Sequence, residues 1–209
     1  MKRRKPLFIG IWNRSVILTY IGMALAVLGM VLAVSGAEVR YAFACLMGAG
    51  VADLFDGAAA RRVKRTPKEK EFGIQLDSLV DVLSFAALPI VLFVAMGMNQ
   101  WYHLLAEILF AVCSVARLGY FNVVTADAEK AVAYYTGLPV TYCALIFPVI
   151  YLLRYVLTEA VFLLVYTAAV VVVSVLEMLR IPIAKPKGMA YVIFAVLAAA
   201  LLILFLGVL

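Results

Sequence analysis

Four aspartates stand in apolar surroundings in the first half of the chain. Asp53 and Asp56 lie inside one hydrophobic run, and Asp77 and Asp81 stand at the start of the next. A carboxylate at the centre of a membrane helix costs about 2.5 to 3.5 kcal/mol, so four unpaired ones would cost on the order of 10 to 14 kcal/mol. Something must neutralise them, and clustered carboxylate oxygens are the ligands that Mg²⁺ and Mn²⁺ prefer.

The spacing of these acids predicts that they share helix faces. One stripe, at i, i+3, i+4, i+7 and i+8, consists of Asp53, Asp56, Gly57, Ala60 and Arg61. A second, at i, i+4 and i+8, consists of Gly73, Asp77 and Asp81. Two antiparallel helices would bring the four carboxylates together, and two divalent ions would cancel their charge. The small residues are then expected where a bulky ligand approaches the backbone; the alternative is that they only let helices pack closely.

The composition indicates what kind of protein holds these acids. Of 209 residues, 67% are hydrophobic and 14% are charged, which is typical of an integral membrane protein. A spanning helix takes about 20 apolar residues, so little is left for a soluble catalytic domain and we treat 1–209 as one membrane domain. The net charge of +6 comes from cations at the ends of apolar runs, which does not indicate a nucleic-acid partner. Three well-separated cysteines predict neither disulfides nor a zinc site.

We therefore predict an all-α fold, a polytopic transmembrane helical bundle with about seven spans. The apolar runs are 16–36, 41–60, 79–98, 101–124, 138–157, 160–178 and 189–209. The division within 138–178 is weak, so six or eight spans remain open. Pro67 is expected to end any helix that continues through the preceding basic loop, so the second and third spans should form a hairpin.

The distribution of cations predicts the orientation in the cell membrane. A cytoplasmic N-terminus leaves only Arg40 and Arg154 outside, in agreement with the positive-inside rule. The cytoplasmic cations are then Lys2 to Lys5, Arg14, those of the loop 61–71, Lys130, Arg180, Lys185 and Lys187. Most of the loop cations are expected to contact anionic lipid headgroups. The acids, and with them the active site, would face the cytoplasm.

A divalent-metal or proton transporter is an alternative, since intramembrane acids also line ion pathways. The four aspartates lie toward one side of the membrane, Asp53 being about 12 Å from the turn at Arg61. No chain of acids continues to the other side. Glu107 is the nearest candidate, and its place near the outer start of its span favours an isolated acid.

The strings DLFDGAAAR (53–61) and GIQLDSLVD (73–81) resemble the signature of the CDP-alcohol phosphotransferase family, DxxDGxxAR followed by GxxxDxxxD. The spacer of eleven residues between Arg61 and Gly73 is longer than is usual in the family. A family Ser or Thr that contacts phosphate therefore has no fixed counterpart, and Thr66 and Lys70 are both candidates. The resemblance extends from about residue 11 to residue 141.

The resemblance implies transfer of a phosphatidyl group from CDP-diacylglycerol to an alcohol, with release of CMP and a need for two divalent ions, Mg²⁺ or Mn²⁺. It implies that Asp53, Asp56, Asp77 and Asp81 bind metal and that Asp81 is also the catalytic base. It further implies a CDP-diacylglycerol site, formed by Asp53, Asp56, Gly57, Ala60, Arg61, Gly73 and Asp77. A homodimer is the family's usual assembly.

Within the family, three segments are similar to the phosphatidylserine synthase branch. They are 71–89, with its FGxxLDSLxD pattern, RLGYFN (117–122) and GLP (137–139). Tyr120 departs from that branch, where many members have a second arginine. The acceptor implied is L-serine, and Arg117, supported by Asn122, is the expected partner of its carboxylate. The alternatives are glycerol 3-phosphate, inositol phosphate or a phospholipid as acceptor.

Overall fold

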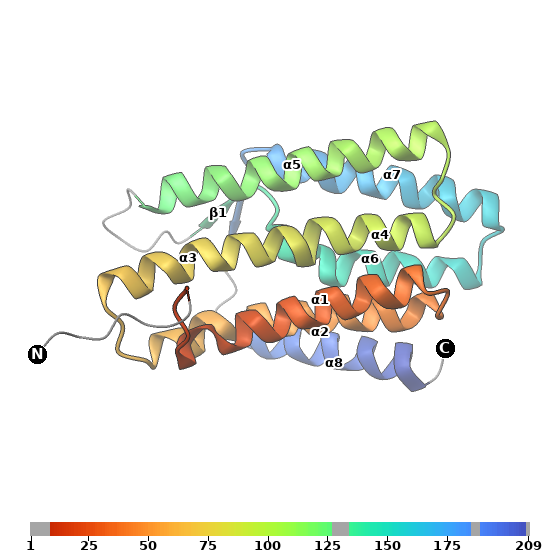
Figure 1. Ribbon diagram of the computed structural model, residues 1–209. Helices are drawn as coiled ribbons and strands as arrows, with labels where there is room; N and C mark the ends of the chain where they lie inside the picture. The colour runs from red at the N-terminus through yellow and green to blue at the C-terminus, as the bar shows by residue number, and fades with distance from the viewer. Residues whose placement is uncertain (1–8, 127–133, 185–188, 208–209) are drawn as a thin grey trace, which may run out of the picture.

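The computed structural model describes residues 9–126, 134–184 and 189–207, and in these ranges helices run side by side along one direction (Figure 1). The helices are α1 (Ile17–Val34), α2 (Val39–Arg61), α3 (Pro67–Asp81), α4 (Leu88–Ala95), α5 (Trp101–Ala126), α6 (Cys143–Tyr151), α7 (Glu159–Met178) and α8 (Met189–Gly207). Two three-residue strands, β1 (Tyr134–Thr136) and β2 (Pro182–Ala184), form an antiparallel pair. The all-α prediction is confirmed, and the small strand pair was not predicted.

Each of the seven predicted apolar runs coincides with a helical segment. Five segments are long and apolar enough to cross a membrane: Arg14–Val34, Val39–Arg61, Pro67–Ala95, Trp101–Val124 and Glu159–Met178. The stretches Val140–Tyr155 and Val192–Gly207 are shorter apolar helices. The chain is a polytopic membrane protein. The cations predicted at positions 2–5, 130, 185 and 187 lie outside the described residues.

The third helical segment begins at Pro67, before the apolar run 79–98, and the residues of the predicted second stripe, Gly73, Asp77 and Asp81, all lie on it. Thr66 caps this helix, because its side chain accepts a hydrogen bond from the Glu69 backbone while the Glu69 carboxylate accepts one from the backbone N–H of Thr66. Pro67 occupies the first turn, where no backbone N–H is needed. The hairpin of α2 and α3 is thus confirmed, and α3 carries its acids on a polar extension of the span.

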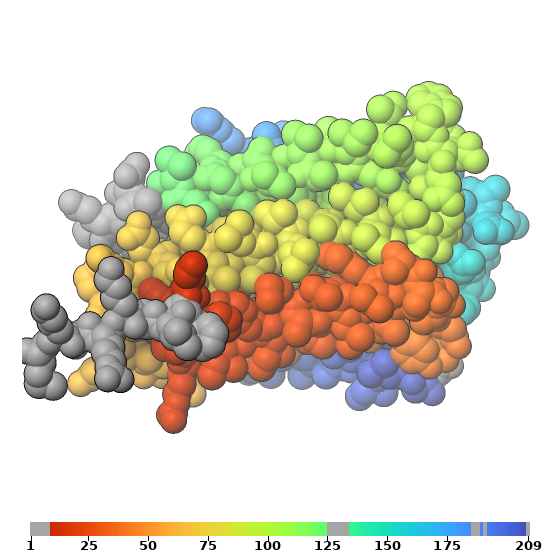
Figure 2. Space-filling view, viewed as in Figure 1, coloured from red at the N-terminus to blue at the C-terminus, as the bar shows by residue number. Residues whose placement is uncertain are grey.

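Polar side chains face inward and apolar ones outward along α5. His103, Glu107, Ser114 and Arg117 are buried, whereas leucines and valines between them are exposed. Figure 2 shows α1, the continuous α3–α4 segment and α5 forming one flank of the bundle. Exposed apolar residues on these helices include Ile21, Val31, Val94, Leu105 and Val112. Such a surface suits lipid, because only the interior offers partners for polar groups.

Small residues let α1 and α2 pack closely. The buried face of α1 consists of Thr19, Gly22, Ala26, Gly29 and Ala33. A Cβ added at Gly29 would lie 3.0 Å from Cys45 Cβ and 3.0 Å from Leu88 Cδ1, so a side chain here would force the helices apart. This packing holds the start of α1 against the end of α2, where the acids are.

A π-helical segment, Val82–Ala87, joins α3 to α4 directly after Asp81. Pro89 lacks the backbone N–H that a regular helix would direct to the Phe85 carbonyl. The Cys143 thiol donates to this carbonyl oxygen instead, at 3.3 Å. Cys143, Cys45 and Cys113 are all free and buried.

The strand pair fastens the segment before α6 to the end of α7. Gly137 adopts a positive φ of 75°, and its N–H donates to the Ile181 carbonyl at 2.9 Å. A Cβ at Gly137 would lie 2.4 Å from the Glu177 carbonyl oxygen, so only glycine fits. The pair lies at the end of the bundle where α3 begins (Figure 1).

Candidate active site

Three of the four aspartates form one cluster between α2 and α3. Asp53, Asp56 and Asp77 each offer a carboxylate oxygen, and these atoms lie within 4.8 Å of one another. All three side chains are partly buried. Asp81 lies one turn further along α3 and is 9% exposed. The prediction that the hairpin gathers the acids is confirmed for these three, and Asp81 stands beside the cluster rather than in it.

Among the described residues, no arginine or lysine forms an ion pair with this cluster. The ion pair found in this part of the chain joins Arg40 to Glu38, at the other end of α2. The hydroxyl of Thr19 donates to Asp56 at 3.1 Å. Three carboxylates that face one another without a cation repel strongly in a poorly solvated place. The donor set is hard oxygen throughout, so it fits a divalent cation such as Mg²⁺ or Mn²⁺.

A cavity of about 200 Å³ opens on one side of the cluster, and we call it the basic cavity. Its polar lining consists of Ser15, Thr19, Asp56, Arg61, Arg65 and Asp77. Its wall also includes the small residues Gly57, Ala60 and Gly73. Except for Asp53 and Asp81, the residues of both predicted stripes thus line one cavity. Two arginines and two carboxylates are among its lining residues. A phosphate bridged by cations would suit it.

The small residues of this cavity are not required by helix packing. A Cβ on Gly57 would meet only Arg61 Nη1, at 3.5 Å, and one on Gly73 would meet only Arg65 Nη1, also at 3.5 Å. Both are ordinary contacts, in contrast to Gly50, whose added Cβ would lie 2.7 Å from Ala144 Cβ. Glycine at positions 57 and 73 therefore leaves room in the cavity rather than bringing helices together.

The two candidates for a phosphate contact in the spacer, Thr66 and Lys70, do not line the basic cavity. The Thr66 hydroxyl is engaged in the helix cap with Glu69. Arg65 lines the cavity instead, and its Nε is buried without a hydrogen-bond partner among the described residues. The longer spacer thus contributes an arginine where the sequence suggested a hydroxyl or a lysine.

A second cavity, of about 330 Å³, lies on the other side of Asp77, and we call it the Arg117 cavity. Its charged lining consists of Asp53, Asp77, Asp81 and Arg117. Arg117 is 7% exposed and its guanidinium lies 5.2 Å from the centre of the Phe121 ring. Asn122 also lines this cavity, and its amide donates to Ser78 Oγ at 2.7 Å. Both predicted acceptor residues therefore share one space with Asp81.

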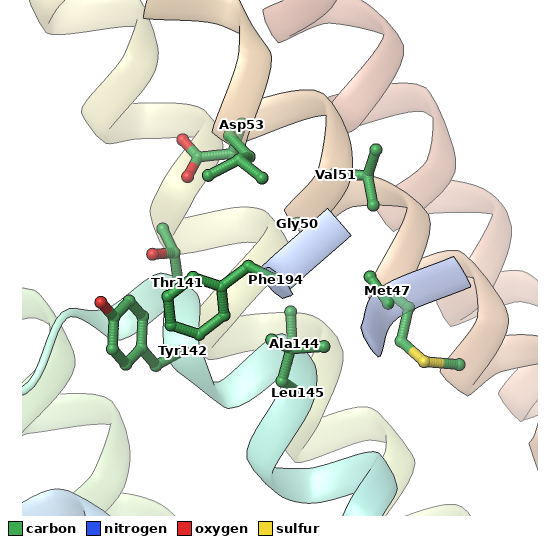
Figure 3. A pocket seen from close by; sticks show the side chains of 11 residues that line it. Met47, Gly50, Val51, Asp53, Thr141, Tyr142, Ala144, Leu145 and Phe194 are labelled. Carbon is green, nitrogen blue, oxygen red and sulfur yellow. The ribbon is translucent and has the colours of Figure 1, made fainter. Parts of the chain in front are cut away.

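An apolar pocket of about 60 Å³ adjoins the site between α2, α6 and α8 (Figure 3). Asp53 and Thr141 line both this pocket and the Arg117 cavity. The rest of its wall includes Met47, Leu145 and Phe194. One member of the carboxylate cluster, Asp53, therefore borders an apolar pocket.

A comparison with protein families agrees with these features. The model of the CDP-alcohol phosphatidyltransferase family matches residues 12–176, which is most of the chain and includes both stripes of acids. The chain belongs to this family.

Two curated relatives have related names. The chain is 33% identical over 108 residues to a CDP-diacylglycerol–serine O-phosphatidyltransferase of Saccharomyces cerevisiae, a match that covers 49% of the chain and 38% of that protein. It is 28% identical over 130 residues to an archaetidylserine synthase of Methanothermobacter thermautotrophicus, covering 62% of the chain and 54% of that protein. The chain thus matches about four tenths of one relative and just over half of the other.

The sequence analysis did not identify the residues that α1, α7 and the strand pair place in or near the candidate active site. Thr19 belongs to the stripe of small residues on α1, which was a signal for close packing against α2. Glu177 is an acid in an otherwise apolar run, the same signal that identified the aspartates. Tyr135 lines the Arg117 cavity and lies in no apolar run, so nothing local indicated it.

Proposed function

We propose that this protein transfers the phosphatidyl group of CDP-diacylglycerol to the hydroxyl of L-serine, giving phosphatidylserine and CMP. One observation carries the proposal: a carboxylate cluster lies between a cavity with two arginines and a cavity with one buried arginine. The first suits a diphosphate and the second suits a small acceptor with a carboxylate. The names of the two relatives support serine as the acceptor.

The basic cavity is the proposed place of the CDP head. Arg61 and Arg65 would hold diphosphate oxygens by charge-assisted hydrogen bonds. Gly57, Ala60 and Gly73 would leave the space that the nucleotide fills. The diacylglycerol chains would remain in the bilayer beside the apolar pocket of Figure 3.

Asp53, Asp56, Asp77 and Asp81 would hold two divalent ions, Mg²⁺ or Mn²⁺. When bound, these ions would neutralise the negative charge that collects on the departing CMP phosphate. Thr19 orients Asp56 through its hydrogen bond. Protein side chains would then bind serine and accept its hydroxyl proton.

Arg117 would bind the carboxylate of serine and place its hydroxyl near Asp81, because both residues line the same cavity. The Asp81 carboxylate would accept the hydroxyl proton while the serine oxygen forms a bond to the lipid-bearing phosphorus. The bond from that phosphorus to the bridging oxygen breaks, and CMP leaves with the electron pair. Asn122, held by Ser78, would support the acceptor.

We propose a cytoplasmic position for this end of the bundle. The described cations there include Arg14, the cations of 61–70 and Arg180, whereas Arg40 and Arg154 lie at the opposite end. The positive-inside rule then places the site in the cytoplasm. We further propose that residues 1–209 act as one membrane domain and assemble as a homodimer, which family resemblance supports.

Other acceptors of the same chemistry are glycerol 3-phosphate, inositol phosphate and phospholipids. A phosphorylated acceptor would need further cations, and Arg117 is the arginine that the Arg117 cavity offers among the described residues. A single guanidinium suits a carboxylate. This favours serine.

Transport of metal or protons is less well supported. Glu107 and Ser114 are about 10 Å apart along α5. Between them lies Phe110, which is fully buried and packs against Phe93 and Phe147 at ring distances of 5.9 and 5.4 Å. This buried aromatic cluster lies between Glu107 and Ser114 and offers no polar group to an ion or proton.

The test is release of CMP by the purified protein from CDP-diacylglycerol with Mg²⁺ or Mn²⁺. Serine-dependent release is expected, with none above background when glycerol 3-phosphate, inositol phosphate or no acceptor is added. Release with a different acceptor would overturn the assignment to serine. Absence of release with every acceptor, together with metal flux in proteoliposomes, would support transport instead.

A further inference from the structure

A fifth buried acid, Glu177, lies close to the proposed site on a helix that the family signature does not include. It belongs to the last turn of α7 and is 2% exposed. A negative charge at the C-terminal end of a helix is disfavoured by the helix dipole, and burial disfavours it further. Glu177 therefore needs partners that compensate both costs.

The partners come from one face of α5. Ser114 Oγ donates to Glu177 Oε2 at 2.8 Å. Arg117 follows one turn later on the same face and lines, with Glu177, a cavity of about 150 Å³ that we call the Glu177 cavity. Glu177 Oε1 and Arg117 Nε are both buried without hydrogen-bond partners among the described residues. One is an acceptor and the other is a donor, and both side chains line this cavity, although no salt bridge joins them among the described residues.

Arg117 also lines the Arg117 cavity and thus separates the two spaces. The charges of Glu177, Asp81 and Asp53 all act on its guanidinium. Without Glu177, the carboxylates that act on the guanidinium would be Asp81 and Asp53, which both line the Arg117 cavity. An acid on the opposite side leaves one edge of the guanidinium directed at an incoming carboxylate.

We propose that Glu177 is a positioning residue that holds Arg117 in the orientation that binds the acceptor carboxylate. The proposal rests on the proposed function, since it takes Arg117 as the acceptor-binding residue. It does not depend on how the donor binds. Glu177 acts through Arg117 and does not touch the donor or the reacting phosphorus.

The experiment compares Glu177→Gln with Glu177→Asp in detergent, measuring KM for serine and for CDP-diacylglycerol separately. Glutamine keeps the size of the side chain and an oxygen for Ser114 but removes the charge. We expect a roughly tenfold higher KM for serine and an unchanged KM for CDP-diacylglycerol. Aspartate restores the charge and should recover part of the loss.

Glu107→Gln is the matched control, because Glu107 is a carboxylate on α5 that is 4% exposed and about 15 Å along the helix from Arg117. It should leave both KM values unchanged. Glu177→Gln should also add no further increase in KM for serine when Arg117 is already glutamine, since the charge on which Glu177 acts is then absent.

The proposal is overturned if Glu177→Gln leaves KM for serine within twofold of the wild type. It is equally overturned if both KM values and the melting temperature change together without recovery in Glu177→Asp, which would mean a structural role. Absence of serine-dependent CMP release in the wild type would instead refute the proposed function, so the two failures are distinguishable.

Discussion

An alanine at position 57 is expected to leave the protein folded and to impair its use of CDP-diacylglycerol. The added Cβ would contact only Arg61 Nη1, at 3.5 Å, which requires no movement of the backbone. Alanine also gains about 1 kcal/mol over glycine in a helix interior. The free energy of unfolding should therefore stay the same or rise, although position 57 lies at the centre of the site.

The substitution should instead weaken the binding of CDP-diacylglycerol. Gly57 lines the basic cavity, so a methyl group there would occupy space assigned to the CDP head. Overfilling a packed site costs about 1 to 3 kcal/mol, which corresponds to roughly 5- to 150-fold weaker binding. The KM for CDP-diacylglycerol should rise by that factor, while the KM for serine should change little.

Gly50→Ala is the control, because the same change on the same helix meets a different obstacle. Its Cβ would lie 2.7 Å from Ala144 Cβ, so α2 and α6 would have to move apart. This variant should lower the melting temperature in detergent, whereas Gly57→Ala should not. Normal kinetics in Gly57→Ala would show that the basic cavity does not hold the donor.

Three further substitutions test individual assignments. The Asp81→Asn variant should still bind CDP-diacylglycerol but turn it over at least about 100-fold more slowly, because the substitution removes the catalytic base. Near-normal CMP release would exclude Asp81 as the base. Arg65→Gln should raise KM for CDP-diacylglycerol roughly tenfold, because it removes a charged contact to the diphosphate. Lys70 lies outside the basic cavity, so Lys70→Gln should leave this KM unchanged. Equal effects of the two substitutions would refute a specific contact by Arg65. Thr66→Ala should lower the free energy of unfolding by about 1 kcal/mol through loss of the cap with Glu69, which a lower melting temperature would show. The folded variant should keep its activity. Lost activity at unchanged stability would indicate a phosphate contact by Thr66 instead.

Most of the helical architecture could be predicted from the sequence, because each span is a continuous apolar run. The start of α3 could not be found in this way, since its first turns are polar and hydropathy detects only the part in lipid. A different local signal was present, because Thr66 and Glu69 have the spacing of a capping box. Apolarity alone marked the span from residue 79, whereas the spacing of Gly73, Asp77 and Asp81 already indicated a helix before it.

Contacts between distant helices could not be predicted from periodicity. The hydrogen bond from Thr19 to Asp56 joins residues 37 positions apart. The strand pair joins Tyr134 to Ala184 through three residues on each side, too few to form a strand pattern. Such contacts depend on which helix faces meet, and the small residues of α1 indicate only that some close packing occurs.

The four aspartates form a single set in the sequence, but the cavities divide them. Asp56 lines only the basic cavity of the two, Asp81 lines only the Arg117 cavity, and Asp77 lines both. Spacing of i, i+4 gives Asp77 and Asp81 the same helix face, and it cannot indicate that the next turn opens into a different space. The division matches the roles proposed here, because a base must reach the acceptor, whereas a residue between donor and acceptor must contact both. Asp77 is then the carboxylate whose loss should impair the use of both substrates.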